Sequence, residues 1–517
     1  MTMTATTDET QPLLLRAAAT NNPAAPNAIG AGGSATTAPQ SAADSESTVV
    51  DFDPCGDPDN PLEWPAAFRW SVVLMLAMTA FTVTFTCISV VPLANEIGRD
   101  LGGDARSKAA SVLLVTIWEL GEAAGPLLIA PLSEMVGRYR VVNTANALFI
   151  VATLLAATSA SLPQFVAARM LTGLAVATNV LSPAIVGDIF VSEQRGGALS
   201  LVFLAPLLGG AVGPAISGAI AERAGWRAVV WLSAALAVLC ELLFLTFFRE
   251  TYKVTILRRR AARLARESGK PFRTEFDGEE ESGGGSGGLG RLRDAMLRPV
   301  TVLAGSSVLV IVCLYGSVCF AYYYVITVTL ADILRDVYHL PPVQAGLCFI
   351  TVSLGSAVAV FACNRSLDPI YIRLRDANKG VGQPEHRLPV AIGGAFVMPA
   401  TVAAYGWAAA LHLPLPALLA SMAVLGAALM FTMIPLMAYV VDAFGLYSAS
   451  AMTGVIVVRC LVGTFLPLTT APLVDNFGYG WGFTVFAALS FAIAPVPALV
   501  MRYGARWRQK SEYTRDQ

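Results

Sequence analysis

The chain has 517 residues and a formal net charge of −1 at pH 7, with 55% hydrophobic and only 14% charged residues. Its mean hydropathy is +0.61. A soluble domain rarely has this composition, so the sequence argues against a soluble enzyme and indicates a polytopic membrane protein.

The first 68 residues are expected to form a disordered cytoplasmic tail, because they are rich in Ala, Thr, Pro and acidic residues. They contain no apolar stretch suited to a signal peptide. Glu9, Leu13 and Leu14 have the spacing of an acidic dileucine sorting signal, a short address that a receptor reads; chance occurrence is the alternative. A vacuolar or endosomal membrane therefore stays open beside the plasma membrane.

Twelve apolar stretches follow, each long enough to cross about 30 Å of hydrocarbon as a helix of roughly 20 residues. Because lipid offers backbone amides no partner, helices are the expected spanning structure. The stretches lie near 70–92, 109–132, 141–160, 165–187, 198–220, 227–248, 300–325, 345–363, 388–410, 415–440, 451–474 and 481–501. The sequence predicts an all-α polytopic membrane protein with twelve transmembrane helices in two pseudo-symmetric six-helix bundles, 69–248 and 299–503.

An even number of spans places both termini on one side of the membrane. Most Lys and Arg residues fall on the side of the termini, in the central loop 249–298, in other short loops and in the tail 504–517, so both termini are expected in the cytoplasm. Ile256–Glu267 has Leu, Ala and Arg at helical spacing, as in an amphipathic helix lying on anionic lipid. Residues 279–290 form a Gly- and Ser-rich linker. A merely solvated connector is the alternative for this loop.

The sequence contains no paired-cysteine metal motif, Walker loop or dinucleotide fingerprint. We therefore expect no enzyme activity, no metal, no cofactor and no ATP-driven pumping. The chemistry has to come from polar groups within the membrane. Such groups are costly unless they face the bundle interior, are paired or take up protons.

The intramembrane charges are the candidates for proton coupling. Glu119 and Glu122 lie three residues apart in span two, on one helical face, and Glu241 is a third carboxylate in span six. Arg169 and Arg459 are the two cations that could neutralise them. A static buried ion pair that fixes helix packing is the alternative role for each of these five residues.

Span five has two rows of small residues at four-residue spacing. One row is Ala205, Gly209, Gly213 and Ser217, and the neighbouring row is Pro206, Gly210, Pro214 and Gly218. Small residues let another helix approach closely, and proline removes an internal hydrogen bond. The span therefore predicts a close packing seam that can bend.

Several segments resemble the major facilitator superfamily. APLSEMVGRYRVV (130–142) is similar to its signature loop, with Glu134 where the pattern has Asp; ARMLTGLAVATNV (168–180) is similar to its fourth-span motif, and GGAVGPAISG (209–218) to its antiporter motif. NPLEWP (60–65), ELGEAAGPLLIAPLSE (119–134), FRETYKVTILRRRA (248–261) and VVRCLVGTFLPL (457–468) resemble the fungal twelve-span drug:proton antiporters. The resemblance covers roughly residues 60–500.

The resemblance implies roles for further residues. Glu134, Gly137, Arg138 and Asp188 correspond to a charge cluster that latches helices in the outward-open state, and Gly209, Gly213, Pro214 and Gly218 correspond to the antiporter motif. The degenerate second loop contains Asp368 and Arg373. Spans one, four, seven and ten are expected to line a substrate cavity, with Thr86, Ser89, Asn179, Ser182, Tyr315, Tyr322, Tyr323, Met433 and Met437. Interface tyrosines and filler methionines are the alternative for the last five.

Together these features predict a secondary active transporter: a monomeric proton-coupled antiporter that exports drugs, toxins or secondary metabolites. The proton gradient is its energy source. Its expected partners are the lipid bilayer, a small-molecule substrate and protons, with no nucleic acid. A proton-linked importer of a nutrient such as a polyamine or vitamin is one alternative, and a non-transporting membrane sensor on the same scaffold is another.

Overall fold

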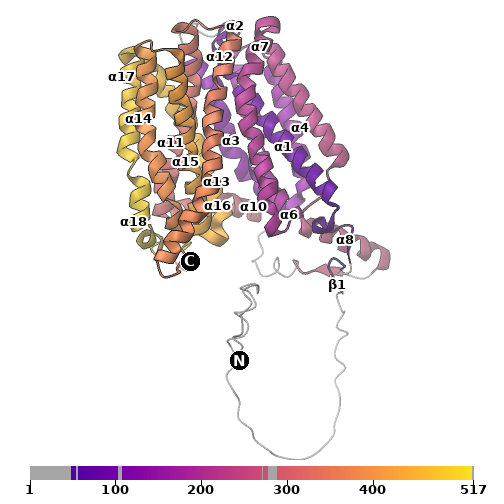
Figure 1. Cartoon of the computed structure of the whole chain (residues 1–517). Helices are drawn as coiled ribbons and strands as arrows, with labels where there is room; N and C mark the ends of the chain where they lie inside the picture. The colour runs from indigo at the N-terminus through magenta and orange to yellow at the C-terminus, as the bar shows by residue number, and fades with distance from the viewer. Residues whose placement is uncertain (1–47, 54–55, 103–107, 270–271, 277–287, 515–517) are drawn as a thin grey trace, which may run out of the picture. The chain divides into compact units, whose positions relative to one another are not determined.

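The computed structural model describes residues 48–53, 56–102, 108–269, 272–276 and 288–514, and most of this part of the chain is helical (Figure 1). The dileucine motif and most of the glycine-rich linker lie outside the described residues. Figure 1 shows α8, β1 and α18 at one end of the helices and α2 and α12 at the other. We refer to these as the α8 end and the α2 end.

The first half of the helical region begins with a proline-capped helix and ends with a very long one. Its elements are α1 Ala66–Ile88, η3 Val91–Leu93, α2 Ala94–Asp100, α3 Lys108–Val136, α4 Arg138–Ala157, α5 Leu162–Leu174, α6 Thr178–Ile189 and α7 Ser192–Phe247.

The second half repeats this pattern of long apolar helices. Its elements are α11 Ser307–Asp336, α12 Pro342–Cys348, α13 Ile350–Ala377, η4 Pro384–Arg387, α14 Pro389–Ala410, α15 Leu415–Phe444, η5 Gly445–Tyr447, α16 Ser448–Phe465, η6 Leu466–Thr469, α17 Thr470–Ile493 and α18 Val496–Arg508.

Within the described residues, nine continuous helical stretches are long and apolar enough to cross a membrane. Two of them, Gln194–Phe247 and Ser448–Arg508, have 54 and 61 residues, more than twice the length that one crossing needs. Gly225 (φ 74°) and Gly478 (φ 72°) interrupt these stretches with non-helical backbone that glycine tolerates. The short helices α5 and α6 form one further span in series. The helices thus accommodate all twelve predicted spans.

Each half has its own packing, and a small set of helices joins the halves. In the first half α1 packs against α7, and α3 and α4 pack against α5; in the second, α13 and α14 pack against α15, and α11 against α16. Between the halves, α3 packs against α16, and α7 packs against α12 and α13. The contacts of α3 and α7 therefore decide how the two halves are placed against each other.

The segment before α1 differs from the expected structureless tail. Within it, β1 Thr48–Val50 pairs in parallel with β2 Phe272–Thr274 of the central loop, and η2 spans Pro61–Glu63. Trp64 is buried and donates from Nε1 to the Pro58 carbonyl at 3.1 Å. The expectation was wrong for the described residues from Thr48 onward, because the β1 backbone pairs with β2 and Asp57 pairs with Arg260, each more than 200 positions away, which local composition does not reveal.

The central loop contains the helix that its amphipathic pattern predicts. α8 spans Lys253–Ser268 and therefore includes all of the predicted segment 256–267. A further helix, α10 Gly288–Ala304, leads into α11 and contacts α3 and α16.

Candidate functional site

Two buried carboxylates on α3 form the centre of the candidate site. Glu119 and Glu122 are 2% and 6% exposed, and they lie on one face of the helix, turned into the protein. A carboxylate oxygen of each and Cys460 Sγ all lie within 4.8 Å of one another. These are possible metal-ligand atoms, but Arg459 also lies against Glu122, and its positive charge disfavours a second cation at the same place.

Each carboxylate accepts a hydrogen bond from the second half of the chain. Arg459 on α16 donates from Nη2 to Glu122 Oε1 at 3.1 Å, and Tyr324 on α11 donates from its hydroxyl to Glu119 Oε1 at 2.5 Å. Trp118 Nε1 lies 3.3 Å from Glu122 Oε2. Glu119 Oε2 is buried and has no hydrogen-bond partner among the described residues. The two acids of one half are thus held by a cation and a phenol of the other.

Close helix contacts fix the orientation of this face of α3. A Cβ added at Gly121 would clash with the Met170 carbonyl of α5, and one added at Gly173 would clash with the Trp118 carbonyl of α3. The two helices therefore touch backbone to backbone, as small residues allow in membranes. On the other side, Gly463 of α16 lies against Glu119, so a glycine also leaves room for the carboxylate.

Arg169 is buried but does not pair with the acids. Its Nη1 and Nη2 donate to the carbonyls of Thr86 and Cys87 at 2.9 and 3.0 Å, and its guanidinium lies 4.7 Å from the Trp118 ring centroid. It thus satisfies carbonyls at the end of α1 that have no partner within the helix. Of the two cations considered from sequence, Arg459 alone forms an ion pair with an α3 acid within the described part of the chain.

Glu241 stands apart from the pair on α3. It is 8% exposed, and its Oε2 has no hydrogen-bond partner among the described residues. No ion pair of the described residues links it to Arg169 or Arg459. The structure does not bring this third carboxylate into the Glu119–Glu122 cluster.

The residues predicted as a latch come together in part, with Glu250 beside Arg138 in place of Glu134; we call this cluster the latch, and its conformational role stays a prediction. Arg138 Nε lies 3.3 Å from Asp188 Oδ2, and the Arg138 backbone amide donates to Glu250 Oε1 at 2.8 Å. Thr251 donates to Asp188 at 3.1 Å. Glu134 is exposed and forms no ion pair with Arg138 among the described residues.

Gly137 is needed where α3 meets the latch. Its φ of 105° is unfavourable for other residues, and a side chain at this position would clash with the Glu250 carboxylate. Arg138 also donates to Ser133 Oγ, and its guanidinium lies 4.7 Å from the Tyr252 ring centroid. The segment that precedes α8 therefore completes the latch.

The second half has a related charge cluster. Arg387 lies 2.8 Å from Asp368 and 3.0 Å from Asp442, which is near the end of α15. Arg373 forms no ion pair among the described residues. Of the two residues considered from the degenerate loop, only Asp368 belongs to this cluster.

The two small-residue rows of α7 pack against different neighbours. Gly209 lies against the α1 backbone at Phe81 and Phe85, and Gly213 lies against Phe85, so this row packs within the first half. In the other row, Gly218 lies against the Pro342 carbonyl.

That second row faces the other half of the chain. The Pro214 carbonyl lies against Gly346 of α12, and Gly210 faces the Tyr323 hydroxyl of α11. Asn95 Nδ2 also donates to Asp332 Oδ1 at 2.5 Å between the halves, near the α2 end. The halves are therefore closed against each other at this end.

The substrate-cavity candidates lie in different surroundings. Ser89, Ser182 and Tyr315 are buried, and their hydroxyls have no hydrogen-bond partner among the described residues. Thr86 donates within α1 to the Thr82 carbonyl, while Met433 is buried, Met437 and Tyr323 are partly buried, and all three belong to or pack on the largest core cluster. The side chain of Asn179 lies outside the described residues.

Tyr322 does not belong with the other candidates. It is 1% exposed and donates from its hydroxyl to the Phe486 carbonyl of α17 at 2.9 Å. Its side chain therefore points into the core of the second half. Residues adjacent in a helix point about 100° apart, so the neighbouring tyrosines face other directions. Tyr324, two positions on, reaches Glu119 instead.

Sequence reasoning missed several residues of these clusters. Tyr324 was not among the candidate residues, although it follows the cavity candidates Tyr322 and Tyr323 directly, and Glu250 and Thr251 lay in a segment used only for its resemblance. The buried position of Cys460 beside two acids has no signal in the sequence. Only Glu250 offered a clue, since an acid next to the predicted basic helix marks a possible partner for nearby cations.

The helical architecture and this buried charged pair define a polytopic transporter built from two halves. Residues 71–467 match the Major Facilitator Superfamily, and the chain belongs to this family. It is 30% identical to the efflux pump radE of Floropilus chiversii over 468 residues, and this aligned region covers 90% of this chain and 86% of the pump. The identity to the MFS transporter cpaT of Aspergillus oryzae is also 30%, over 90% of this chain and 92% of that protein.

Solved structures agree on the fold. The D-xylose–proton symporter superposes with a TM-score of 0.63 at 17% identity, covering 84% of this chain and 97% of the symporter. The human organic anion transporter MFSD10 superposes with a TM-score of 0.58 at 18% identity, covering 84% of this chain and 100% of that protein. The predicted fold of two six-helix bundles is confirmed, and the protein is a membrane transporter.

Proposed function

We propose that this transporter is a proton-coupled antiporter that exports small organic molecules by alternating access. The observation that carries the proposal is that the two α3 carboxylates are held by Arg459 and Tyr324 of the other half. A buried acid with partners on both sides of a moving interface changes its environment whenever the interface moves. Such an acid can link proton binding to conformation.

The coupling step follows from where the two charges lie. If α3 and α16 move apart, the ion pair between Glu122 and Arg459 breaks, and a buried charge without a partner is strongly unfavourable. A proton on Glu122 neutralises the acid and so stabilises the separated arrangement. Loss of the proton restores the attraction. Glu119 offers a second site, because its unpartnered Oε2 can hold a proton while Oε1 accepts from Tyr324.

Export is favoured by the relatives rather than by the fold. The similar proteins include one named as an efflux pump, whereas the similar structures include a proton symporter. Tyr323, Met433 and Met437 offer adaptable apolar surface, which suits varied drugs, toxins or secondary metabolites. We further propose that the α8 end lies in the cytoplasm and that the protein resides in the plasma membrane.

The test begins with substrate identification. Small molecules retained and secreted by cells that lack or overproduce the protein are profiled, with and without a protonophore. Compounds whose secretion depends on both the protein and the gradient are then assayed in proteoliposomes with an imposed pH gradient. Opposite flux, with compound entering along with protons, would support the nutrient importer, and absence of any protein-dependent flux would support the sensor.

Glu122→Gln is the decisive variant. It keeps the shape of the side chain but removes the titrating group, so we expect normal folding and membrane delivery with loss of gradient-driven efflux. Glu241→Gln is the comparison, since Glu241 is also a buried acid but forms no ion pair with the second half among the described residues; we expect it to keep coupled efflux. Unchanged gradient-driven efflux in Glu122→Gln and Glu119→Gln would contradict the proposal.

A further inference from the structure

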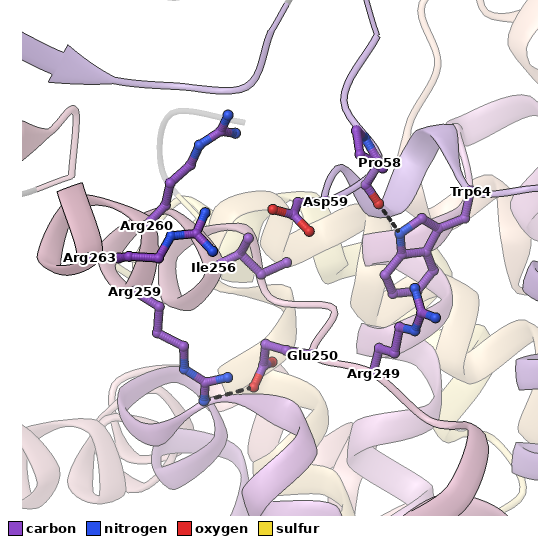
Figure 2. A pocket seen from close by; sticks show the side chains of 9 residues that line it. All are labelled: Pro58, Asp59, Trp64, Arg249, Glu250, Ile256, Arg259, Arg260 and Arg263. Atoms are coloured by element: carbon purple, nitrogen blue, oxygen red, sulfur yellow. Dashed lines mark hydrogen bonds and ion pairs between the residues drawn. The ribbon is translucent and has the colours of Figure 1, made fainter. Parts of the chain in front are cut away.

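A hollow at the α8 end is surrounded by arginines. Its volume is about 340 Å³, and it lies between the segment before α1 and the start of α8. Figure 2 shows arginines of α8 on one side and Arg249 with Trp64 on the other. The lining residues are Pro58, Asp59, Trp64, Arg249, Glu250, Ile256, Arg259, Arg260 and Arg263.

The arginines of this hollow are only partly neutralised. Arg260 forms an ion pair with the buried Asp57, and Arg259 Nη2 lies 3.5 Å from Glu250 Oε2. Arg249 and Arg263 are exposed and form no ion pair among the described residues. Four guanidinium groups thus meet the lining carboxylates Asp59 and Glu250 and the adjacent Asp57, so the cavity keeps one positive charge in excess.

Asp57, which lies next to the lining residues Pro58 and Asp59, is held in its charged state. Burial raises the pKa of Asp57, but the hydrogen bonds from Arg260 and from the amides of Asp59 and Asp53 outweigh burial and hold this pKa below its ordinary value. Asp57 therefore stays ionised at neutral pH and anchors Arg260. The anchored segment contributes Pro58, Asp59 and Trp64 to the wall of the cavity.

We propose that this cavity binds an anion with clustered phosphate groups, either the headgroup of a phosphorylated lipid or a soluble polyphosphate. Guanidinium groups match phosphate oxygens with paired hydrogen bonds, and the volume is at the lower end of the range for small-ligand sites. Basic pockets at the ends of membrane helices suit lipid phosphates. This site lies apart from the α3 carboxylates, so the proposal does not depend on proton coupling.

Glu250 links the cavity to the latch. It lines the hollow, pairs weakly with Arg259, and accepts the Arg138 amide at 2.8 Å. A phosphate that draws Arg259 away leaves Glu250 more available to Arg138. Occupancy is therefore expected to strengthen the contact between the central loop and the start of α4.

The test uses the purified full-length protein and two probes. Inositol hexakisphosphate is titrated against the protein in detergent, and binding to nanodiscs containing phosphatidylinositol bisphosphate is compared with nanodiscs of equal charge made with phosphatidylserine. The variant Arg249→Gln/Arg263→Gln removes the two arginines without ion pairs. Arg266→Gln is the matched control, because Arg266 is an exposed arginine of α8 that does not line the cavity.

We expect saturable binding that weakens by about tenfold or more in the double variant, since charge-assisted hydrogen bonds are lost, and that stays unchanged in Arg266→Gln. Binding of the lipid probe alone assigns the site to a headgroup, and binding of the soluble probe alone assigns it to a free polyphosphate. Binding of both supports the shared chemistry. Absence of saturable binding to both probes, or equal weakening in the control and double variants with both proteins monodisperse, would overturn the proposal.

Discussion

The ion pair between the halves can be measured as a coupling free energy. Glu122→Gln and Arg459→Gln each remove one charge, and the double variant removes both. A hydrogen bond to a charged group contributes about 1.5–3 kcal/mol, and breaking a fully buried pair costs about 3–5 kcal/mol. Because the Arg459 side chain is 23% exposed while that of Glu122 is 8% exposed, we expect a coupling of about 1.5–3 kcal/mol.

The assay is reversible unfolding of the full-length protein in mixed detergent micelles, with the four proteins compared as a double-mutant cycle. Arg335→Gln with Asp336→Asn is the control cycle, since this pair has a short 2.8 Å contact but side chains that are 45% and 53% exposed; its coupling should stay within about 0–1 kcal/mol. Additivity of Glu122→Gln and Arg459→Gln within about 0.5 kcal/mol would refute the view that this pair holds the halves together.

Two further predictions concern the ends of the molecule. Gly218→Ala places a methyl group against the α12 backbone, so we expect faster thiol labelling of a cysteine substituted for the buried Ala345 of α12. Gly393→Ala, at a glycine with open space around its Cβ, should leave the labelling rate unchanged. Equal labelling rates in the two variants would contradict the packing argument. Because the pKa of Asp57 is lowered in the folded state from its ordinary 3.8, its contact with Arg260 stabilises the segment 48–64 above that value and is lost as pH falls through the lower folded-state pKa. The protection factor of this segment, taken relative to the intrinsic exchange rate at each pH, should fall on acidification, and Asp57→Asn should be poorly protected already at neutral pH. A pH-independent protection factor in the native protein would argue against the contact.

The fold was predictable because membrane insertion makes a local rule decisive. About 20 apolar residues in a row specify a spanning helix whatever the tertiary contacts are, and the twelve spans followed from this rule alone. The helix boundaries did not follow. Gly225 leaves α7 as one helical stretch with a reversal inside it, and the break between α5 and α6 divides a span that looks continuous in sequence.

The sequence predicted the arrangement of the candidate site within a single helix, but not between helices. Spacing on α3 placed Glu119 and Glu122 on the same face, but it could not decide whether Arg169 or Arg459 would meet them. That choice depends on how α5 and α16 rotate against α3, and glycines at 121, 173 and 463 set those contacts. Burial of a charge is a local property, whereas its partner is a property of the packed bundle.

The latch shows the same limit in another form. Glu134 has the right charge and lies four residues before Arg138, yet Glu250 from more than 100 positions away contacts the Arg138 amide instead. The turn at Gly137, with its positive φ, directs the chain so that α4 starts beside the segment before α8. A motif fixes residue types at a spacing, but the acid that completes it comes from whichever chain segment fills the adjacent space.

A single helix connects the carboxylate pair with the latch. α3 carries Glu122 in its interior and Ser133, which accepts from Arg138, near its α8 end. Eleven residues separate the two, or about 17 Å along a helix, and Pro126 and Pro131 lie between them as points where the helix can bend. Where α3 moves as one unit without bending at these prolines, a shift against α16 that stretches the Glu122–Arg459 pair also moves Ser133 relative to Asp188. Protonation in the middle of the protein and opening at its α8 end would then be two consequences of one displacement, which is the property that a coupled transporter requires.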